Sequence, residues 1–264
     1  MASIDTNLAT QTKPEKPRKA PLVSIAAKEG FVVLEIGPQK QHYHVHKALL
    51  THHSEYFRNA FNGSWKESDD KLVTLSDVDT VAVDIFVHWL YNQQMPNEHQ
   101  CDSLHGQNMT SDEYVDDDTL ITGYTKALVF GDRFLAPIFR QAAHDCIVDT
   151  LINVEDPPAS RPPPFFTATQ YAMDNLPSNH SILDLFINVH CRHWDVSDYG
   201  RVDEKSGIAD LLKQNLSPVM LIRIVARYSS MAINLECGWW NEELERCDYH
   251  DHVDDKEREG CERK

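Results

Sequence analysis

A β-branched apolar run and a short alternating segment come early in the chain, and hydrophobic positions then recur at helical spacing. Residues 31–37 are rich in β-branched residues and 42–46 alternate, so both predict strands, and Gly37-Pro38 ends the first one. Together they predict a hairpin. From Lys47 the period lengthens, which favours one or two short helices with Ser54 as a candidate N-cap.

A third alternating segment, 71–79, predicts another strand, and either Asp79 or Thr80 can cap the helix that follows. That helix, 81–95, is apolar around most of its circumference, which is typical of a buried core helix. The order of elements therefore predicts an α+β domain followed by an all-helical extension. Later segments with helical period are 119–134, 137–153, 167–175, 182–194, 208–215 and 218–231.

Charge and composition narrow the classes of function. The 264 residues are 41% hydrophobic and 25% charged, which is typical of a globular protein with a core. The formal net charge of −16 should repel nucleic acid and anionic membranes, so neither is an expected partner. The short basic stretch 13–19 is interrupted by Pro and Glu, and we expect a solvated arm there rather than a nuclear-import signal.

Two absences bear on where the protein works. No signal peptide opens the chain, and no apolar run approaches the roughly 20 residues that span a bilayer. We therefore expect the protein in the cytoplasm or the nucleus, where its six cysteines would stay reduced. Enzyme motifs are also missing: there is no G-x-G-x-x-G, no Walker-type loop, no H-E-x-x-H and no G-x-S-x-G, so no enzymatic activity is expected.

Composition also predicts how the chain is divided. A polar arm that we expect to be disordered covers residues 1–24, and the α+β domain covers 25–153 with an acidic insertion at 97–118. The proline-rich run 157–164 marks the end of this half. A helical extension (154–246) and a charged tail that contains Cys and His (247–264) complete the prediction.

The first half contains His46-Lys47, Leu49-Leu50, Ser54 and Tyr56-Phe57 in this order. This order of residues resembles the BTB/POZ family. In this family the second strand ends in a His and a basic residue, and a Leu-Leu pair and a Ser-x-Tyr/Phe-Phe step follow. The resemblance implies a BTB/POZ fold, a small mixed sheet capped by a helical cluster, over about residues 28–150. The matching positions are His46-Lys47, Leu49-Leu50, Ser54 and Tyr56-Phe57, with further likeness in 64–68, 73–79, 86–96 and 128–134.

The acidic insertion, the helical extension and the ending "CDYHDH" look like the BTB proteins common in filamentous fungi. The resemblance implies a module for protein–protein interaction. Many BTB domains carry an Asp just before the first strand, at the dimer interface, whereas this chain has Lys28-Glu29-Gly30. Without this Asp, the usual homodimer geometry of the family is not expected to be kept unchanged. Homo- or hetero-oligomerisation stays among the expected functions.

The resemblance also implies a partner-binding candidate. BTB domains that recruit a cullin scaffold carry a hydrophobic-x-Glu step shortly before the third strand, and Trp65-Lys66-Glu67 fits this pattern. Trp65 and Glu67 would then contact the scaffold, and the protein would be a substrate adaptor of a cullin-type ubiquitin ligase. The alternative is that Trp65 covers the core of its own domain. An oligomerising scaffold without a ligase is the competing function.

Histidines at 42, 44 and 46 would share one face of a strand, which is a spacing that three zinc ligands can have. Structural zinc prefers thiolate partners, and the nearest cysteine is Cys101, in the acidic insertion. We therefore expect these histidines to be framework and surface residues. His46 resembles the structural histidine of the family, placed where an imidazole can bond unsatisfied backbone groups at the strand-to-helix corner.

The tail offers a better zinc candidate. Cys247, His250, His252 and Cys261 follow the spacing C-x2-H-x-H-x8-C. Two thiolates and two imidazoles form a legitimate tetrahedral zinc set, which could order a tail with little else to bury. The alternative is a frayed charged helix in which Cys and His are incidental.

Overall fold

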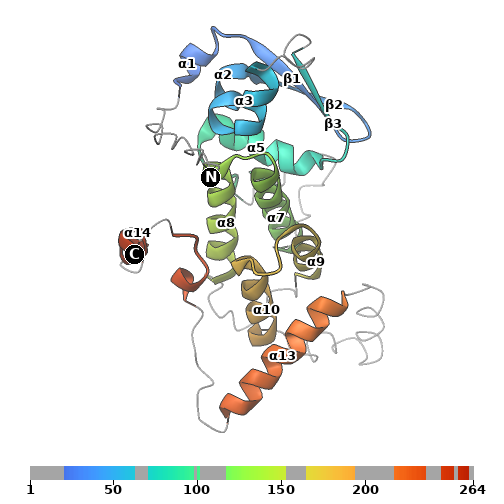
Figure 1. Cartoon of the computed structure of the whole chain (residues 1–264), viewed down its shortest axis with the longest axis vertical. Helices are drawn as coiled ribbons and strands as arrows, with labels where there is room; N and C mark the ends of the chain where they lie inside the picture. The colour runs from blue at the N-terminus through green and yellow to red at the C-terminus, as the bar shows by residue number, and fades with distance from the viewer. Residues whose placement is uncertain are drawn as a thin grey trace, which may run out of the picture.

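The small sheet lies at one end of the structure, a helical core follows it, and the C-terminal segment lies beside that core (Figure 1). A computed structural model describes residues 21–62, 71–97, 100–101, 117–152, 165–193, 217–235, 245–252 and 255–261. The elements with assigned bounds are α1 (Val23–Ala26), β1 (Phe31–Ile36), β2 (Gln41–His46), α2 (Lys47–His53), α3 (Glu55–Asn62), β3 (Leu72–Leu75), α5 (Thr80–Asn92), α7 (Asp117–Arg133), α8 (Pro137–Ile152), α9 (Phe166–Asn175), α10 (Ser181–His193), α13 (Pro218–Leu235), the 3-10 turn η1 (Arg246–Asp248) and α14 (Asp255–Cys261).

The sheet is mixed, and β1 lies at its centre. Strand β1 pairs antiparallel with β2, with Phe31 opposite His46, and parallel with β3, with Val33 opposite Leu72. Alternate residues of the three strands are buried, because successive side chains of a strand point to opposite faces. The three strands and the hairpin that the sequence predicts are confirmed, and so is the α+β class. The buried residues of the sheet are Val32, Leu34, Ile36, Val45, Val73 and Leu75.

Two helix starts have the caps that the sequence predicts. The Ser54 hydroxyl accepts a hydrogen bond from Phe57 N at 3.1 Å, which caps α3. The Asp79 carboxylate accepts from Val81 N at 2.9 Å and caps α5. Helix α5 then buries most of its length, as its apolar circumference predicts, and it ends at Gln93, whose φ of 54° lies in the left-handed region.

Aromatic rings fill the space between α3, α5, α7 and α8. Phe86 of α5 lies 4.9 Å from the rings of Phe130 and Phe139, measured between ring centroids. Phe134, just after α7, lies 5.5 Å from Phe57 of α3. Buried aromatic pairs add about 0.5–1.5 kcal/mol each beyond their area burial, so these contacts hold the helical cluster on the sheet.

The same buried cluster continues past the proline-rich run into α9 and α10, through residues such as Ala168, Ala172, Leu183 and Phe186. Helix α13 packs on α10 through a second cluster that includes Met220 and Ile224. The predicted boundary at residue 153 stays a prediction, although the core crosses that position. Among the described helices, none is long and apolar enough to cross a membrane.

Candidate functional site

The histidines of the first hairpin have separate partners. His42 lies 3.2 Å from the Glu35 carboxylate, and the His44 side chain is exposed. His46 Nδ1 lies 2.8 Å from Tyr91 Oη, in α5. Within the described ranges, the residues that gather as a metal-ligating group lie elsewhere, at the C-terminus.

We expected the His46 imidazole to bond backbone groups at the strand-to-helix corner, and this stays a prediction. The structure shows the imidazole beside a side-chain hydroxyl, that of Tyr91. The Tyr91 hydroxyl accepts from the His46 amide at 3.2 Å and contacts the imidazole at 2.8 Å. Because a hydroxyl can both donate and accept, the Tyr91 hydroxyl can hydrogen-bond the amide and the imidazole of His46 at the same time.

His53 at the end of α2 is a buried neutral imidazole. Its ring lies 4.9 Å from the Trp89 ring, edge to face, and its Nδ1 has no hydrogen-bond partner among the described residues. Burial, with a smaller contribution from His52, lowers the pKa of His53 to about 4. This histidine therefore belongs to the framework of the helical cluster.

Trp65 and Glu67, the predicted partner-binding residues, lie outside the described residues, in the chain that follows α3. The start of α3 is described, and it is fixed against the α7–α8 turn. The Ser54 hydroxyl donates to Phe134 O at 2.6 Å, and Leu135 O accepts from Glu55 N at 3.1 Å. The motif residues Leu50 and Phe57 are buried beneath this junction.

Exposed apolar side chains surround the same junction. Tyr56 is 37% exposed, Leu135 51% and Ile138 59%, and the Tyr56 ring lies 5.0 Å from the Phe134 ring. We call these three residues the α3–α8 patch. Because hydrogen bonds fix the backbone that carries them, a partner would meet an ordered apolar surface.

Two further regions expose large apolar side chains. One, which we call the α1–β1 residues, lies in α1 with its preceding residue and at the start of β1: Leu22, Val23, Ile25 and Phe31. The other is the outer face of α13, opposite its packed residues Met220 and Ile224: Val219, Leu221, Ile222 and Val225.

At the C-terminus the structure brings together three of the four predicted zinc ligands. One ligand atom from each of Cys247, His252 and Cys261 lies within 4.8 Å of the others. The fourth predicted ligand, His250, lies beside this group, with Nδ1 3.2 Å from Cys261 Sγ. The turn η1 supplies Cys247, and the last residue of α14 supplies Cys261.

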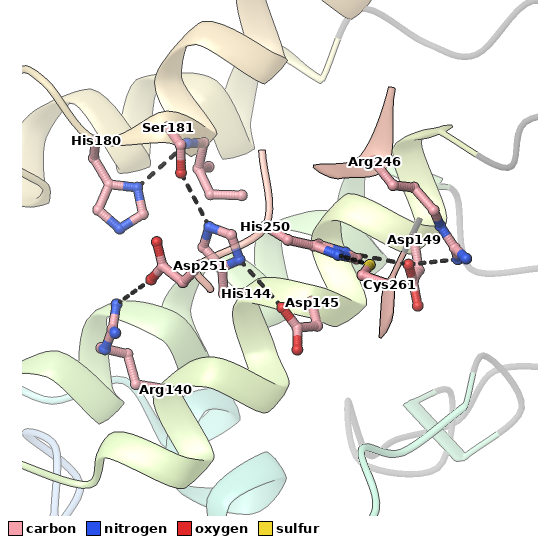
Figure 2. Close-up of polar contacts among 11 residues, drawn as sticks. Arg140, His144, Asp145, Asp149, His180, Ser181, Arg246, His250, Asp251 and Cys261 are labelled. Atoms are coloured by element: carbon pink, nitrogen blue, oxygen red, sulfur yellow. Dashed lines mark hydrogen bonds and ion pairs between the residues drawn. The ribbon is translucent and has the colours of Figure 1, made fainter. Parts of the chain in front are cut away.

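Ion pairs and hydrogen bonds attach this segment to the helical core (Figure 2). Arg246 pairs with Asp149 of α8, and Asp251 pairs with Arg140 of α8 at 2.9 Å. The Tyr249 hydroxyl accepts from Asn188 of α10 at 2.8 Å. The ligand cluster thus lies against the outer side of α8 rather than on a free tail.

The chemistry of the cluster suits a cation. Burial is the main cause that lowers the pKa of His250, and a neutral imidazole is the form that binds a metal. No disulfide joins Cys247 and Cys261, and a cysteine that binds a metal does so as the thiolate. Sequence reasoning missed Arg140 and Asp149. Arg140 lies more than a hundred positions before its partner Asp251, and no local sequence pattern marks either residue.

The structure shows a small mixed sheet packed on a helical cluster, with exposed apolar side chains at the helix ends, an arrangement suited to binding other proteins. Residues 31–112 match the family model described as BTB/POZ domain, and this part of the chain is a BTB/POZ domain. BTB/POZ domains form a family of protein-interaction domains, not of enzymes. No curated protein matches the chain.

Proposed function

We propose that this protein is a substrate adaptor whose BTB/POZ domain docks on a cullin-type ubiquitin-ligase scaffold in the cytoplasm or nucleus. The observation that carries the proposal is the α3–α8 patch. Its three apolar side chains stand on a backbone fixed by Ser54 and Leu135, and the chain that follows α3 holds Trp65 and Glu67. An apolar anchor with an acidic neighbour suits a pocket flanked by basic or amide groups.

The test is a binding titration of the full chain against the N-terminal region of a cullin. An acidic side chain in a buried apolar contact is strongly unfavourable, so Ile138→Asp should weaken binding at least about tenfold. Trp65→Ala combined with Glu67→Ala should do the same. Ile222→Asp is the matched control, because Ile222 is equally exposed but lies on α13, far from α3 (Figure 1). Unchanged binding by both test variants contradicts the proposal.

The second candidate is an oligomerising scaffold that works without a ligase. The α1–β1 residues favour it, since Leu22, Ile25 and Phe31 expose at least half of their surface next to the sheet. A second copy or a related chain would cover them. Sedimentation at micromolar concentration should show a dimer that Ile25→Asp dissociates, and a strictly monomeric wild-type protein contradicts this candidate.

We also propose that the Cys/His group at the C-terminus holds zinc and thereby orders the tail. Mixed thiolate and imidazole ligands favour zinc over magnesium or calcium, which prefer oxygen. The protein, purified without a His tag, should contain about one zinc per chain by elemental analysis. Cys247→Ser should lose it, whereas Cys191→Ser, a buried thiol on α10, should keep it. Metal-free protein would favour incidental Cys and His in the tail.

A further inference from the structure

His250 has its two ring nitrogens directed at two different groups (Figure 2). Nδ1 lies 3.2 Å from Cys261 Sγ, and Nε2 lies 3.5 Å from the Asp149 carboxylate of α8. The imidazole is therefore placed between the ligand cluster and the helical core. His250 Nε2 makes no hydrogen bond among the described residues, but a proton on this nitrogen would face the Asp149 oxygen that pairs with Arg246, and the Nδ1 lone pair would then face Cys261.

Zinc chemistry uses this arrangement. In a tetrahedral site with Zn–S of about 2.3 Å and Zn–N of about 2.0–2.1 Å, a sulfur and a nitrogen ligand are about 3.5 Å apart. The observed 3.2 Å between His250 Nδ1 and Cys261 Sγ is close to that edge. A zinc-bound histidine commonly donates its other N–H to a carboxylate, which fixes the ring and raises its basicity.

The cluster also contains a polar atom that lacks a partner. His252 Nε2 is buried and has no hydrogen-bond partner among the described residues. An unpaired buried nitrogen costs roughly 1–3 kcal/mol, and a bound cation would satisfy it. One nitrogen of His252 and the two sulfurs make three ligands, and a closed structural zinc site needs a fourth.

We infer that His250 is that fourth ligand, through Nδ1, and that Asp149 of α8 is the positioning residue that holds its Nε2–H. This inference rests on the zinc proposed above. All four ligands then belong to the C-terminal segment, and the ion is coupled to the helical core because His250 also contacts Asp149 of α8.

Neighbouring contacts fit this coupling. Asp149 also pairs with Arg246, the residue before Cys247, and Arg140 of α8 pairs with Asp251, between the two histidines. Metal binding and docking of the tail should therefore occur together. Removal of zinc should release 245–261 from α8, while the sheet and the aromatic cluster stay folded.

The experiment measures zinc affinity of the full chain by competition with a chromophoric chelator. Asp149→Asn should bind zinc about 10–100-fold more weakly at unchanged stoichiometry, as for other outer-shell carboxylates. His250→Ala should weaken binding further, and its cobalt-substituted form should lose the visible spectrum of a four-ligand tetrahedral site. Asp174→Asn, an exposed carboxylate on α9, and His44→Ala, an exposed histidine on β2, are the matched controls.

A double-mutant cycle separates positioning from a general structural role. If Asp149 acts through His250, Asp149→Asn should weaken zinc binding much less in the His250→Ala background than in the wild type. Equal effects in the two backgrounds overturn the assignment of Asp149. If the His250→Ala and Asp149→Asn variants bind zinc as tightly as the controls, the inference about both residues is wrong, while the proposal of a zinc site still holds. A wild-type protein that binds no zinc overturns both proposals.

Discussion

Ser54 connects two helices with a single hydroxyl, and its removal should be costly. The side chain is fully buried, accepts from Phe57 N at 3.1 Å and donates to Phe134 O at 2.6 Å. Ser54→Ala removes an N-cap worth about 1 kcal/mol and leaves a buried carbonyl without this donor, which costs about 1–3 kcal/mol. We therefore expect the free energy of unfolding to fall by about 2–4 kcal/mol.

The assay is urea unfolding followed by far-UV circular dichroism. The midpoint should fall at an unchanged m-value, since the surface exposed on unfolding is the same. Ser229→Ala makes the same chemical change at an exposed position of α13 and should stay within about 0.5 kcal/mol of the wild type. A Ser54→Ala loss no larger than that of the control would refute the reasoning, because it would mean that neither bond contributes.

Three further predictions concern the BTB half, its junction with α8, and the caps. His53 has a folded-state pKa of about 4, below that of an unfolded histidine, so the unfolded chain binds more protons and stability falls as the pH drops below about 6.5. His53→Gln should reduce the loss of unfolding free energy between pH 7.5 and 5.5 by about 1 kcal/mol in urea titrations, and His44→Gln should not. Gly131→Ala would place a methyl group 2.8 Å from Arg140 Cα, so we expect it to lower the melting temperature. In the control Gly260→Ala the added methyl group has no neighbouring atom within 4 Å, and the melting temperature should stay unchanged or rise. Asp79→Asn should keep the cap of α5 and lose only an exposed ion pair with Lys126, at a cost below about 1 kcal/mol of unfolding free energy. Asp79→Ala should cost more, because it also removes the cap. Equal losses for the two variants in urea unfolding would contradict the capping role.

Local chemistry determined much of the fold in advance. The β-branched residues around Val33 and the alternation around Val45 predict the strands, and the apolar circumference of α5 predicts its burial. The caps at Ser54 and Asp79 bond amides two or three residues away, so they are visible in the sequence. The spaced likeness to BTB/POZ domains named the family of the first half, because several segments agree in order.

Spacing alone also brought Cys247, His250, His252 and Cys261 into one candidate set. Three of them lie together because η1 and α14 are close in sequence, and a short connection keeps their ligand atoms near each other. The sequence does not show that His250 lies beside the other three residues and not among them, because this depends on the direction of the His250 ring. That direction follows from contact with α8.

Contacts between distant segments were decided by the tertiary structure. His46 finds the Tyr91 hydroxyl 45 residues away, and Ser54 finds the Phe134 carbonyl 80 residues away. Arg140 and Asp149 meet the tail only because the core brings α8 to that face. The sequence by itself predicted the three strands, the two caps and most of the described helices, although not α1 or η1, because these features depend on neighbours a few residues apart. Which side chains share a site depends on packing between elements, and only the folded chain sets that.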